Sequence, residues 1–366
     1  MAVWILLSLA GVQCAWWLYY FSRVSRYEWP QTNLTNDLPP VSVVICFKGL
    51  PEDFESNLQS VLFQDYPDFE VILVNDYSAT SSPDILQSWI ARQADSNIRI
   101  IHASRDIPGK KQAQQDGVLA ARNKIILFTD MDCRAADPTW IRHMVSRMHE
   151  QNADVVLGYG PMDKKPGLVA WFAGFETVLT ALQYVGFHLA GETYMSVGRN
   201  WLVKKSVYQQ FVHAARGQHL ASGDDDLLLQ AMTSKVRVTA CLHHGSFMYS
   251  APKTTWQDFF RQKSRHISTS FHYPFRISAK LFIFSFSLMA FYALAFLFLW
   301  FGLIPFPYCM LILLAKWLIQ MISHRGAFNL LDGKRYTWTY PLAEMVLVLY
   351  FFILPVFSAF QKNKHW

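Results

Sequence analysis

Cysteine is scarce and unpaired in this sequence. The 366 residues contain five cysteines, none in a C-x-x-C pair, at positions 14, 46, 133, 241 and 309. An odd and scattered set of cysteines predicts neither a disulfide framework nor a zinc site. We expect reduced thiols in a cytoplasmic compartment.

Charged residues are also few. They make up 16% of the chain, well below their share in an average soluble protein, whereas the apolar content is a little above average. The formal net charge of +6 is small and dispersed, which argues against a nucleic-acid partner. The balance predicts a soluble body combined with membrane segments.

Two phosphate-binding fingerprints are absent. The chain has neither a G-x-G-x-x-G sequence nor a G-K-[ST] sequence, and "PGKKQA" at 108–113 holds one glycine and fits neither. A dinucleotide-dependent enzyme and a P-loop NTPase are therefore disfavoured.

The N-terminal segment is long and uncharged. Residues 2–21 carry no charge and are long enough to cross the hydrocarbon core of a bilayer. Arg23 and Arg26 follow this segment, whereas a cleaved signal peptide carries its positive charge before the apolar run. We predict a retained anchor, with the N-terminus outside and residue 23 onward in the cytoplasm.

The C-terminal part is also apolar. Residues 281–323 are long enough for two spans, separated at 304–307 by two prolines that end a helix. The basic segment 323–336 is predicted to be a cytoplasmic loop, followed by a span over 338–359. One span before the soluble body and three after it place the tail, 361–366, outside, which conflicts with its two lysines. Alternatively, one C-terminal span is interfacial or re-entrant.

Between these segments, apolar runs alternate with amphipathic stretches. Strands are predicted over 41–47, 69–76, 98–103 and 124–130, and helices over 54–64, 82–94 and 110–123. Alternating strands and helices with short connections predict an α/β domain with a mostly parallel sheet.

Polar side chains follow the predicted strands. Lys48, Asp76, and the pair Asp130 and Asp132 come directly after the first, second and fourth strands. Open parallel sheets bind ligands at the carboxyl ends of their strands. Two carboxylates two residues apart at a strand end point to the same side and can reach one divalent cation. The alternative is an ordinary acidic turn.

Six motifs in this order resemble those of a membrane-integrated family 2 glycosyltransferase with the GT-A fold. They are "VSVVICF", "VNDYSA", "PGKKQA", "FTDMDC", "GDDDL" and "QKSRH", and they span roughly residues 40–270. The chain is most similar to bacterial glycolipid glycosyltransferases that resemble ceramide glucosyltransferase, and to processive polysaccharide synthases. The implied domains are an anchor at 1–22, a linker at 23–40, the GT-A catalytic domain at 41–250, a basic interfacial segment at 251–280, transmembrane helices at 281–360 and a tail at 361–366.

The resemblance implies a site for a nucleotide sugar and its metal. Asp132, with Asp130, is expected to bind Mg²⁺ or Mn²⁺, and Asp130 alternatively orients the ribose. Asp76 is expected to contact the nucleoside, although the family often has two acids where this chain has Asn75 and Asp76. Lys110 and Lys111 are either phosphate contacts or solvated residues that open a helix.

The motif "GDDDL" is expected to supply the catalytic base. Glycosyl transfer with inversion requires one base within hydrogen-bond reach of the acceptor hydroxyl. Alignment with the family pattern favours Asp225, with Asp224 and Asp226 as alternatives. The other interpretation is that these acids stabilise the N-terminus of a helix.

The motif at 261–266 resembles the Q-x-x-R-W motif of membrane-bound members. Gln262 and Arg265 match that motif, and His266 replaces its tryptophan, which weakens the case for a processive synthase. The three residues are expected to bind the diphosphate. The same segment also reads as a basic amphipathic helix on anionic lipid.

Residues 166–200 are apolar and aromatic at helical spacing. We interpret them as an interfacial helix that lines a lipid path, with core packing as the alternative. The end of this region is expected to form the acceptor floor, through Gly198, Arg199, Asn200 and Trp201.

The sequence thus predicts a metal-dependent, inverting glycosyltransferase in the cytoplasmic (inner) membrane, with its catalytic domain in the cytoplasm. The expected donor is a nucleotide diphosphate sugar, UDP-linked by preference, and the expected acceptor is a membrane lipid. The alternatives are a processive polysaccharide synthase and a catalytically inactive, membrane-anchored interaction protein.

Overall fold

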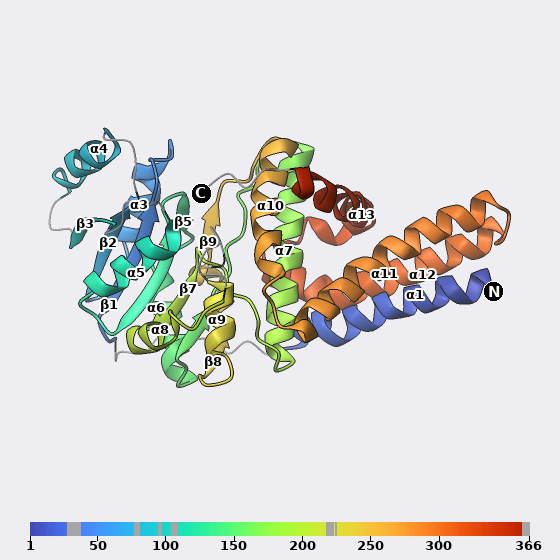
Figure 1. Ribbon diagram of the computed structural model, residues 1–366, viewed down its shortest axis with the longest axis horizontal. Helices are drawn as coiled ribbons and strands as arrows, with labels where there is room; N and C mark the ends of the chain where they lie inside the picture. Colours follow the sequence, from blue (N-terminus) through green and yellow to red (C-terminus); the bar gives the residue numbers. More distant parts are fainter. Residues whose placement is uncertain are drawn as a thin grey trace. The chain divides into compact units, whose positions relative to one another are not determined.

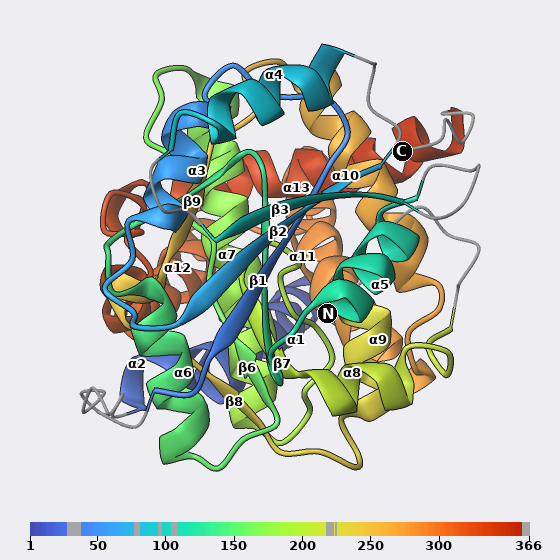
Figure 2. The same cartoon turned by 90° about the vertical axis from the view of Figure 1, so that its left-hand side faces the viewer.

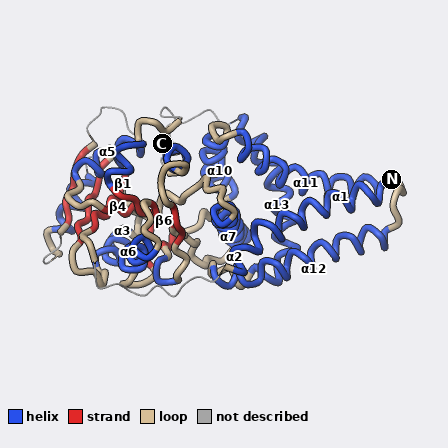
Figure 3. The backbone as a smooth tube through the Cα atoms, turned by 90° about the horizontal axis from the view of Figure 1, so that it is seen from below, coloured by secondary structure: helices blue, strands red, loops and turns tan. Residues whose placement is uncertain are grey.

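A computed structural model describes residues 1–27, 38–76, 81–93, 97–103, 109–216, 223 and 225–360, except for the side chains of Ser81 and Ser268. The chain divides into two compact units. The sheet unit comprises Trp29–Asp163, Thr193–Pro252 and Lys364–Trp366, and the helical unit comprises Met1–Glu28, Lys164–Glu192 and Lys253–Asn363. In Figure 3 all the red strands belong to the sheet unit.

The sheet unit contains a seven-stranded sheet of order β3-β2-β1-β4-β7-β6-β8. Its strands are β1 (Val41–Phe47), β2 (Phe69–Asn75), β3 (Ile98–His102), β4 (Ile125–Asp130), β6 (Val155–Leu157), β7 (Trp201–Lys204) and β8 (Val238–Ala240). β1 to β4 are parallel, β7 runs antiparallel to both of its neighbours, and β6 pairs with β8 in parallel. The predicted α/β class and mostly parallel sheet are confirmed (Figures 1 and 2).

Helices cover both faces of this sheet. They are α3 (Phe54–Leu62), α4 (Ser81–Ile90), α5 (Lys110–Ala120), α6 (Trp140–Glu150), α8 (Lys205–Phe211) and α9 (Asp226–Met232). Val43 and Ile45 of β1 share a core with α3 and α6, whereas Val44 meets α5, so that every residue of β1 is buried. A Cβ at Gly117 of α5 would lie 2.5 Å from Val44 Cγ1, so glycine lets this helix approach the sheet closely.

A two-stranded sheet completes this unit. β5 (Cys133–Ala135) pairs with β9 (Met248–Ser250), which follows a short 3₁₀ turn at His244–Ser246. β5 begins three residues after the end of β4, and the intervening residues include Asp132.

The helical unit contains five helices long and apolar enough to cross a membrane. The first is continuous over Ala2–Arg26 and consists of α1 (Ala2–Trp16), a π-helical turn (Trp17–Phe21) and α2 (Ser22–Arg26). The others are α7 (Leu168–Leu189), α11 (Phe275–Trp300), α12 (Phe306–Leu330) and α13 (Tyr336–Phe360). α10 (Trp256–Ser270) is amphipathic and also belongs to this unit. Large apolar side chains such as Trp4, Phe296 and Leu314 are exposed on these helices, as expected for surfaces that face lipid.

Three boundaries differ from the sequence predictions. The segment at 323–336 is not a loop throughout, because α12 continues to Leu330. Within this last part of α12, Ala327 N donates a hydrogen bond to Ser25 Oγ at 3.0 Å. The predicted linker at 23–40 begins with helix, since α2 extends to Arg26. α7 lies in the helical unit, although the prediction included it in the catalytic domain. The predicted turn at 304–307 does separate α11 from α12.

Candidate active site at the carboxyl edge of the sheet

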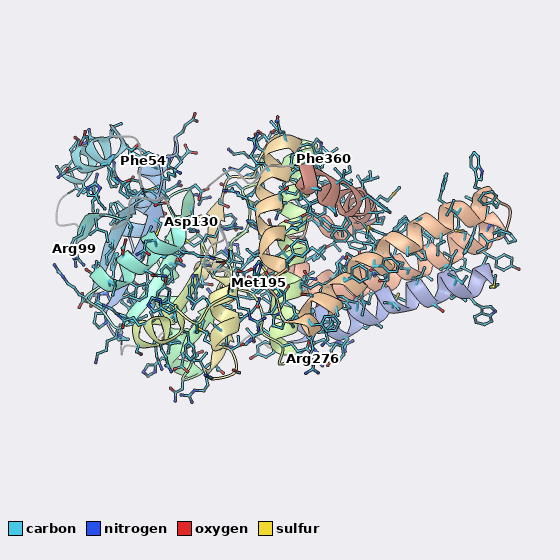
Figure 4. The ribbon with its side chains drawn as sticks, viewed as in Figure 1. Phe54, Arg99, Asp130, Met195, Arg276 and Phe360 are labelled. Carbon is cyan, nitrogen blue, oxygen red and sulfur yellow. The ribbon has the colours of Figure 1, made fainter. Side chains whose placement is uncertain are left out.

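The acidic residues predicted from the strand ends lie on either side of β1. Asp130, which is labelled in Figure 4, ends β4 and is opposite Cys46 of β1. Asp76 directly follows Asn75, which is opposite Phe47. β2 and β3 lie on one side of β1 and β4 lies on the other, so this is the point where the strand order reverses. Such switch points are where open α/β sheets bind their ligands.

Asp76 is completely buried but only partly hydrogen-bonded. Its Oδ1 accepts a hydrogen bond from Gly109 N at 2.9 Å, and its backbone N–H donates to Phe47 O at 2.8 Å. Its Oδ2 has no partner among the described residues. Burial raises the pKa of Asp76, and the Gly109 N–H and the charge of Lys48 only partly offset this effect. An unpartnered buried carboxylate oxygen is costly in isolation, and a ligand donor at this position would remove that cost.

Asp130 and Asp132 form a small cluster with Cys133. One ligand atom from each of the three lies within 4.8 Å of the others. Asp130 is half-buried and Asp132 is exposed, so a ligand from solvent can reach both carboxylates. The Cys133 thiol donates a weak hydrogen bond to Asp132 Oδ1 at 3.5 Å.

The chemistry of this cluster suits a hard divalent cation. Burial raises the pKa of Cys133, and the adjacent charges of Asp132 and Asp130 raise it further, so the thiol stays protonated and is a poor ligand. The two carboxylates then provide the oxygen ligands that Mg²⁺ and Mn²⁺ prefer.

The two lysines have different surroundings. Lys110 Nζ lies 2.8 Å from Asp130 Oδ1, so this side chain pairs with one of the predicted metal ligands. Lys111 lines a small pocket with Gln114, Tyr208 and Gly223. Both residues begin α5 and both are half-buried, so neither is a fully solvated lysine.

The acids of "GDDDL" precede and begin α9. Gly223 has a φ of +84°, which glycine adopts without strain and which turns the chain into this helix. Asp225 is half-buried at the N-cap position, whereas Asp226 is buried and its Oδ1 accepts from Leu227 N at 2.8 Å. Asp224 lies outside the described residues. Of the two described acids, Asp225 is the one that a substrate can reach more easily.

The predicted acceptor floor combines accessible and buried residues. Asn200 is completely buried, and its side chain donates to Tyr159 O and Ser246 O and accepts from Trp140 Nε1. Trp201 is also fully buried and stacks on Phe128 at 4.9 Å between ring centroids. These two side chains are occupied in the domain interior, which corrects the view of all four residues as a floor. Gly198 and Arg199 remain partly exposed.

Two glycines that sequence reasoning did not single out make room for this segment. A Cβ at Gly158 would collide with Asn200, and one at Gly160 would collide with Nε of Arg199. Arg199 Nη2 donates a hydrogen bond to Gly160 O. The sequence "GYG" at 158–160 carried the signal, but only the fold shows which side chains it accommodates.

Gln262, Arg265 and His266 belong to the helical unit and lie on α10. They are three and four residues apart, so they share one face of the helix. Phe259 and Phe260 of the same helix are buried against α7 and α13. α10 is thus amphipathic, as predicted.

Two ion pairs within the helical unit were not predicted from the sequence. Lys263 of α10 donates a hydrogen bond to Glu176 of α7, and both side chains are largely buried. Glu192 and Lys280 form a similar pair. These pairs join segments that are far apart in the sequence, which residue spacing alone does not reveal.

Comparison with known proteins agrees with the fold. The model of "Glycosyl transferase family 2" matches residues 42–211, which include Asp76, Asp130, Asp132 and Arg199. Residues 42–211 are thus similar to a glycosyl transferase family 2 domain. This match and the GT-A fold confirm the resemblance on which the site prediction was based.

Curated relatives of this chain match it over a limited stretch. An uncharacterized glycosyltransferase, EpsJ of Bacillus subtilis, is 31% identical over 123 residues, which are 34% of each chain. The dolichyl-phosphate β-glucosyltransferase of Dictyostelium discoideum is 26% identical over 127 residues, 34% of this chain and 37% of that protein. The match therefore spans about a third of each relative's length.

One solved structure matches almost the whole chain. It is the mannosyltransferase PcManGT of Pyrobaculum calidifontis, determined with GDP-mannose and Mn²⁺. The two share 15% sequence identity with a TM-score of 0.61, and the match covers 96% of this chain and 99% of that one. The similarity extends over both units and establishes the fold.

Proposed function

We propose that this protein is an inverting, metal-dependent glycosyltransferase that transfers a sugar from a nucleotide diphosphate donor to a membrane lipid. The observation that carries the proposal is the set of three acids, Asp76, Asp130 and Asp132, at the switch point of the sheet. Five candidate membrane helices in the same chain support a lipid acceptor. The name of the D. discoideum relative, which specifies dolichyl phosphate, is consistent with this class.

The donor is held by its nucleoside and its diphosphate. Asp76 Oδ2 is buried and accepts a hydrogen bond from the nucleoside. Asp130 and Asp132 would hold Mg²⁺ or Mn²⁺, and the bound ion would supply positive charge to offset the negative charge of the diphosphate. Gln262, Arg265 and His266 are assigned to the same diphosphate, since arginine matches phosphate oxygens with two parallel hydrogen bonds. UDP-sugars are the preferred donor class, and the GDP-mannose bound by the P. calidifontis enzyme makes GDP-sugars the second class to assay.

Asp225 is assigned as the general base. Its carboxylate takes the proton of the acceptor hydroxyl as the hydroxyl oxygen attacks the anomeric carbon, and the nucleotide diphosphate leaves from the opposite side. One displacement inverts the anomeric centre, so an α-linked donor gives a β-linked product. The sheet unit is assigned to the cytoplasmic side of the cytoplasmic (inner) membrane, because the positive charges of Arg23 and Arg26 follow the first span.

The test is an activity assay on the full-length protein in lipid nanodiscs. A panel of UDP-sugars and GDP-mannose with Mn²⁺ is assayed for nucleotide release, and the lipid products are measured by mass spectrometry. The proposal expects a lipid carrying a single added sugar. A ladder of chain lengths would identify a polysaccharide synthase instead. Nucleotide binding without release from any donor would favour the inactive interaction protein.

Three substitutions assign the acids. Asp225→Asn is expected to reduce turnover by roughly 10²- to 10⁴-fold and to leave nucleotide binding intact. Asp132→Asn is expected to remove the metal dependence of nucleotide binding. Asp226→Asn is the matched control for the base, since Asp226 is buried against its own helix. Loss of turnover in Asp226→Asn with full turnover in Asp225→Asn would move the base by one residue.

A further inference from the structure

Arg199 is a cation with an unusual setting within the sheet unit. Its Nε is buried and has no hydrogen-bond partner, and Nη2 donates to the carbonyl of Gly160. Among the described residues, no carboxylate forms an ion pair with it. Two other arginines of the unit, Arg142 and Arg134, form ion pairs with Asp65 and Asp163. A partly buried guanidinium without a counter-charge is costly unless a ligand supplies the charge.

The backbone brings this arginine close to the acidic pair. Ser250 of β9 pairs with Cys133 of β5, which directly follows Asp132. On its other side, Ser250 N donates to Pro161 O at 3.2 Å, and Pro161 follows Gly160. The segment with Gly160, whose carbonyl binds Arg199, is therefore two strand spacings from Cys133, roughly 10 Å. An arginine side chain together with a bound phosphate can span this distance.

Gly160 and Asn200 fix the position of the Arg199 guanidinium. The backbone of Gly160 is outside the positive-φ region, so its conformation is open to any residue. A side chain at this position is excluded by Arg199, because a Cβ would collide with Nε. The next residue, Asn200, fixes the segment through hydrogen bonds to Tyr159 O at 2.7 Å and Ser246 O at 2.8 Å. The arginine thus has a fixed, prebuilt position.

We propose that Arg199 is a phosphate-binding residue, which Gly160 accommodates and Asn200 orients beside the Asp130–Asp132 pair. The inference deepens the proposed function, on which it rests. Two reactants of such an enzyme can carry a phosphate: the diphosphate of the donor, and the phosphate of a polyprenyl phosphate acceptor. The planar guanidinium suits either, because it presents paired N–H donors to phosphate oxygens.

The test measures binding by the full-length protein in nanodiscs, without turnover. One arm titrates inorganic pyrophosphate in the presence of Mn²⁺, and the other measures retention of polyprenyl phosphate against diacylglycerol. Arg199→Gln is expected to weaken binding roughly 10- to 100-fold in at least one arm. Arg199→Lys, which keeps the charge but loses the fork, is expected to give an intermediate loss. Gly160→Ala displaces the guanidinium and is expected to reproduce the effect of Arg199→Gln.

Arg142→Gln is the matched control, since Arg142 is similarly buried but already hydrogen-bonded to Asp65. It is expected to bind as the wild type does in both arms. A loss confined to the pyrophosphate arm assigns Arg199 to the donor, and a loss confined to the polyprenyl phosphate arm assigns it to the acceptor. Wild-type binding in both arms by Arg199→Lys and Gly160→Ala, which retain a folded sheet unit by circular dichroism, would overturn the proposal.

The proposed function fails in a different way. Absence of transfer to any lipid by the wild type, with pyrophosphate binding still dependent on Arg199, would reject the reaction and keep the phosphate site. Transfer at the wild-type rate by Arg199→Gln, with unchanged binding in both arms, would reject the phosphate site and keep the reaction.

Discussion

Glu70 and Asp76 lie near the two ends of β2, and both are almost completely buried. Glu70 accepts hydrogen bonds from Ser42 Oγ at 2.6 Å, Arg122 N at 2.7 Å and Arg99 Nη2 at 2.7 Å. Asp76 accepts one from Gly109 N, and its second oxygen is left without a partner. One carboxylate oxygen of Asp76, which follows β2, thus lacks the hydrogen bonds that Glu70 has near the start of the strand.

The pKa shifts of the two acids have opposite directions. Burial acts to raise both, but the hydrogen bonds from Ser42, Arg122 and Arg99 outweigh it and hold the pKa of Glu70 below its usual value. At Asp76 burial dominates, and the pKa is raised. Glu70 is at the edge where β2 begins and acts in structure, whereas Asp76 is at the carboxyl edge where ligands bind.

The helical unit contains a third buried acid that follows the Glu70 pattern. Glu344 accepts hydrogen bonds from five side chains, which are Tyr292, Lys316, Trp317, Gln320 and Tyr340. Glu344 and Lys316 are both almost completely buried on α13 and α12. The carboxylate oxygens of Glu70 and Glu344, which we assign structural roles, accept hydrogen bonds from the protein. One carboxylate oxygen of Asp76, at the candidate site, has no such partner among the described residues.

The largest expected effect comes from removing the counter-charge of Glu344. Lys316→Met leaves a buried carboxylate without its cation and is expected to reduce stability by about 4 kcal/mol. Unfolding in mixed detergent micelles, followed by tryptophan fluorescence, measures the change. The double substitution Lys316→Met with Glu344→Leu removes both charges and is expected to recover most of the loss. A single variant as stable as the wild type would show that this cluster is not structural.

Glu70→Gln is expected to have the next largest effect. The amide keeps the shape but loses the charge that Arg99 and the Arg122 N–H require, so stability is expected to fall by about 2 kcal/mol. Chemical denaturation of the full-length protein in nanodiscs provides the measurement. Arg99→Gln, which leaves the other two hydrogen bonds in place, is expected to cost less.

Asp76→Asn is the matched substitution at the other end of β2. It replaces a buried charge with a neutral amide of the same size, so the expected change in stability is within about 1 kcal/mol and can be a gain. The same denaturation experiment applies. If this variant lost as much stability as Glu70→Gln, the distinction between the two ends of the strand would be wrong.

The two acids also predict opposite pH dependences of stability, with the smallest effects. Because the pKa of Glu70 is lowered in the folded state, its contribution is present above pH 4.5 and is lost as the pH falls through its folded value. Because the pKa of Asp76 is raised, the folded state loses stability as the pH rises from 3.8 through the folded value. Thermal unfolding between pH 3 and pH 7 measures both. Glu70→Gln should flatten the acid-side loss, and Asp76→Asn should remove the opposing slope.

Local sequence patterns predicted the strands and the acids at their ends. Buried parallel strands such as β1 and β4 are continuous apolar runs, and the first polar residue after each run marks its carboxyl end. Parallel pairing then brings Asp76 and Asp130 to one edge without any knowledge of side-chain contacts. The shared edge of these two residues therefore follows from local patterns alone.

Contacts between distant residues could not be predicted in this way. The collision between a Gly160 Cβ and Arg199, the burial of Asn200, and the ion pair between Lys316 and Glu344 depend on packing that brings together separate parts of the chain. The extent of α12 was also missed, because the basic residues after Ser323 suggested a loop although they continue a packed helix. The basic charge predicted a cytoplasmic loop there, but packing against distant residues stabilises a helix instead.

Calorimetric titration of UDP and GDP with Mn²⁺ tests whether the unpartnered oxygen of Asp76 accepts a hydrogen bond from a bound nucleotide. The measurement compares wild type, Asp76→Asn and Glu70→Gln, at a temperature where all three are folded. Asp76→Asn is expected to bind nucleotide at least roughly tenfold more weakly than the wild type, because one hydrogen bond to a charged group is lost. Glu70→Gln is expected to bind nucleotide within about twofold of the wild type. Unchanged binding by Asp76→Asn, or an equal loss in both variants, would contradict the assignment of Asp76 to nucleotide binding.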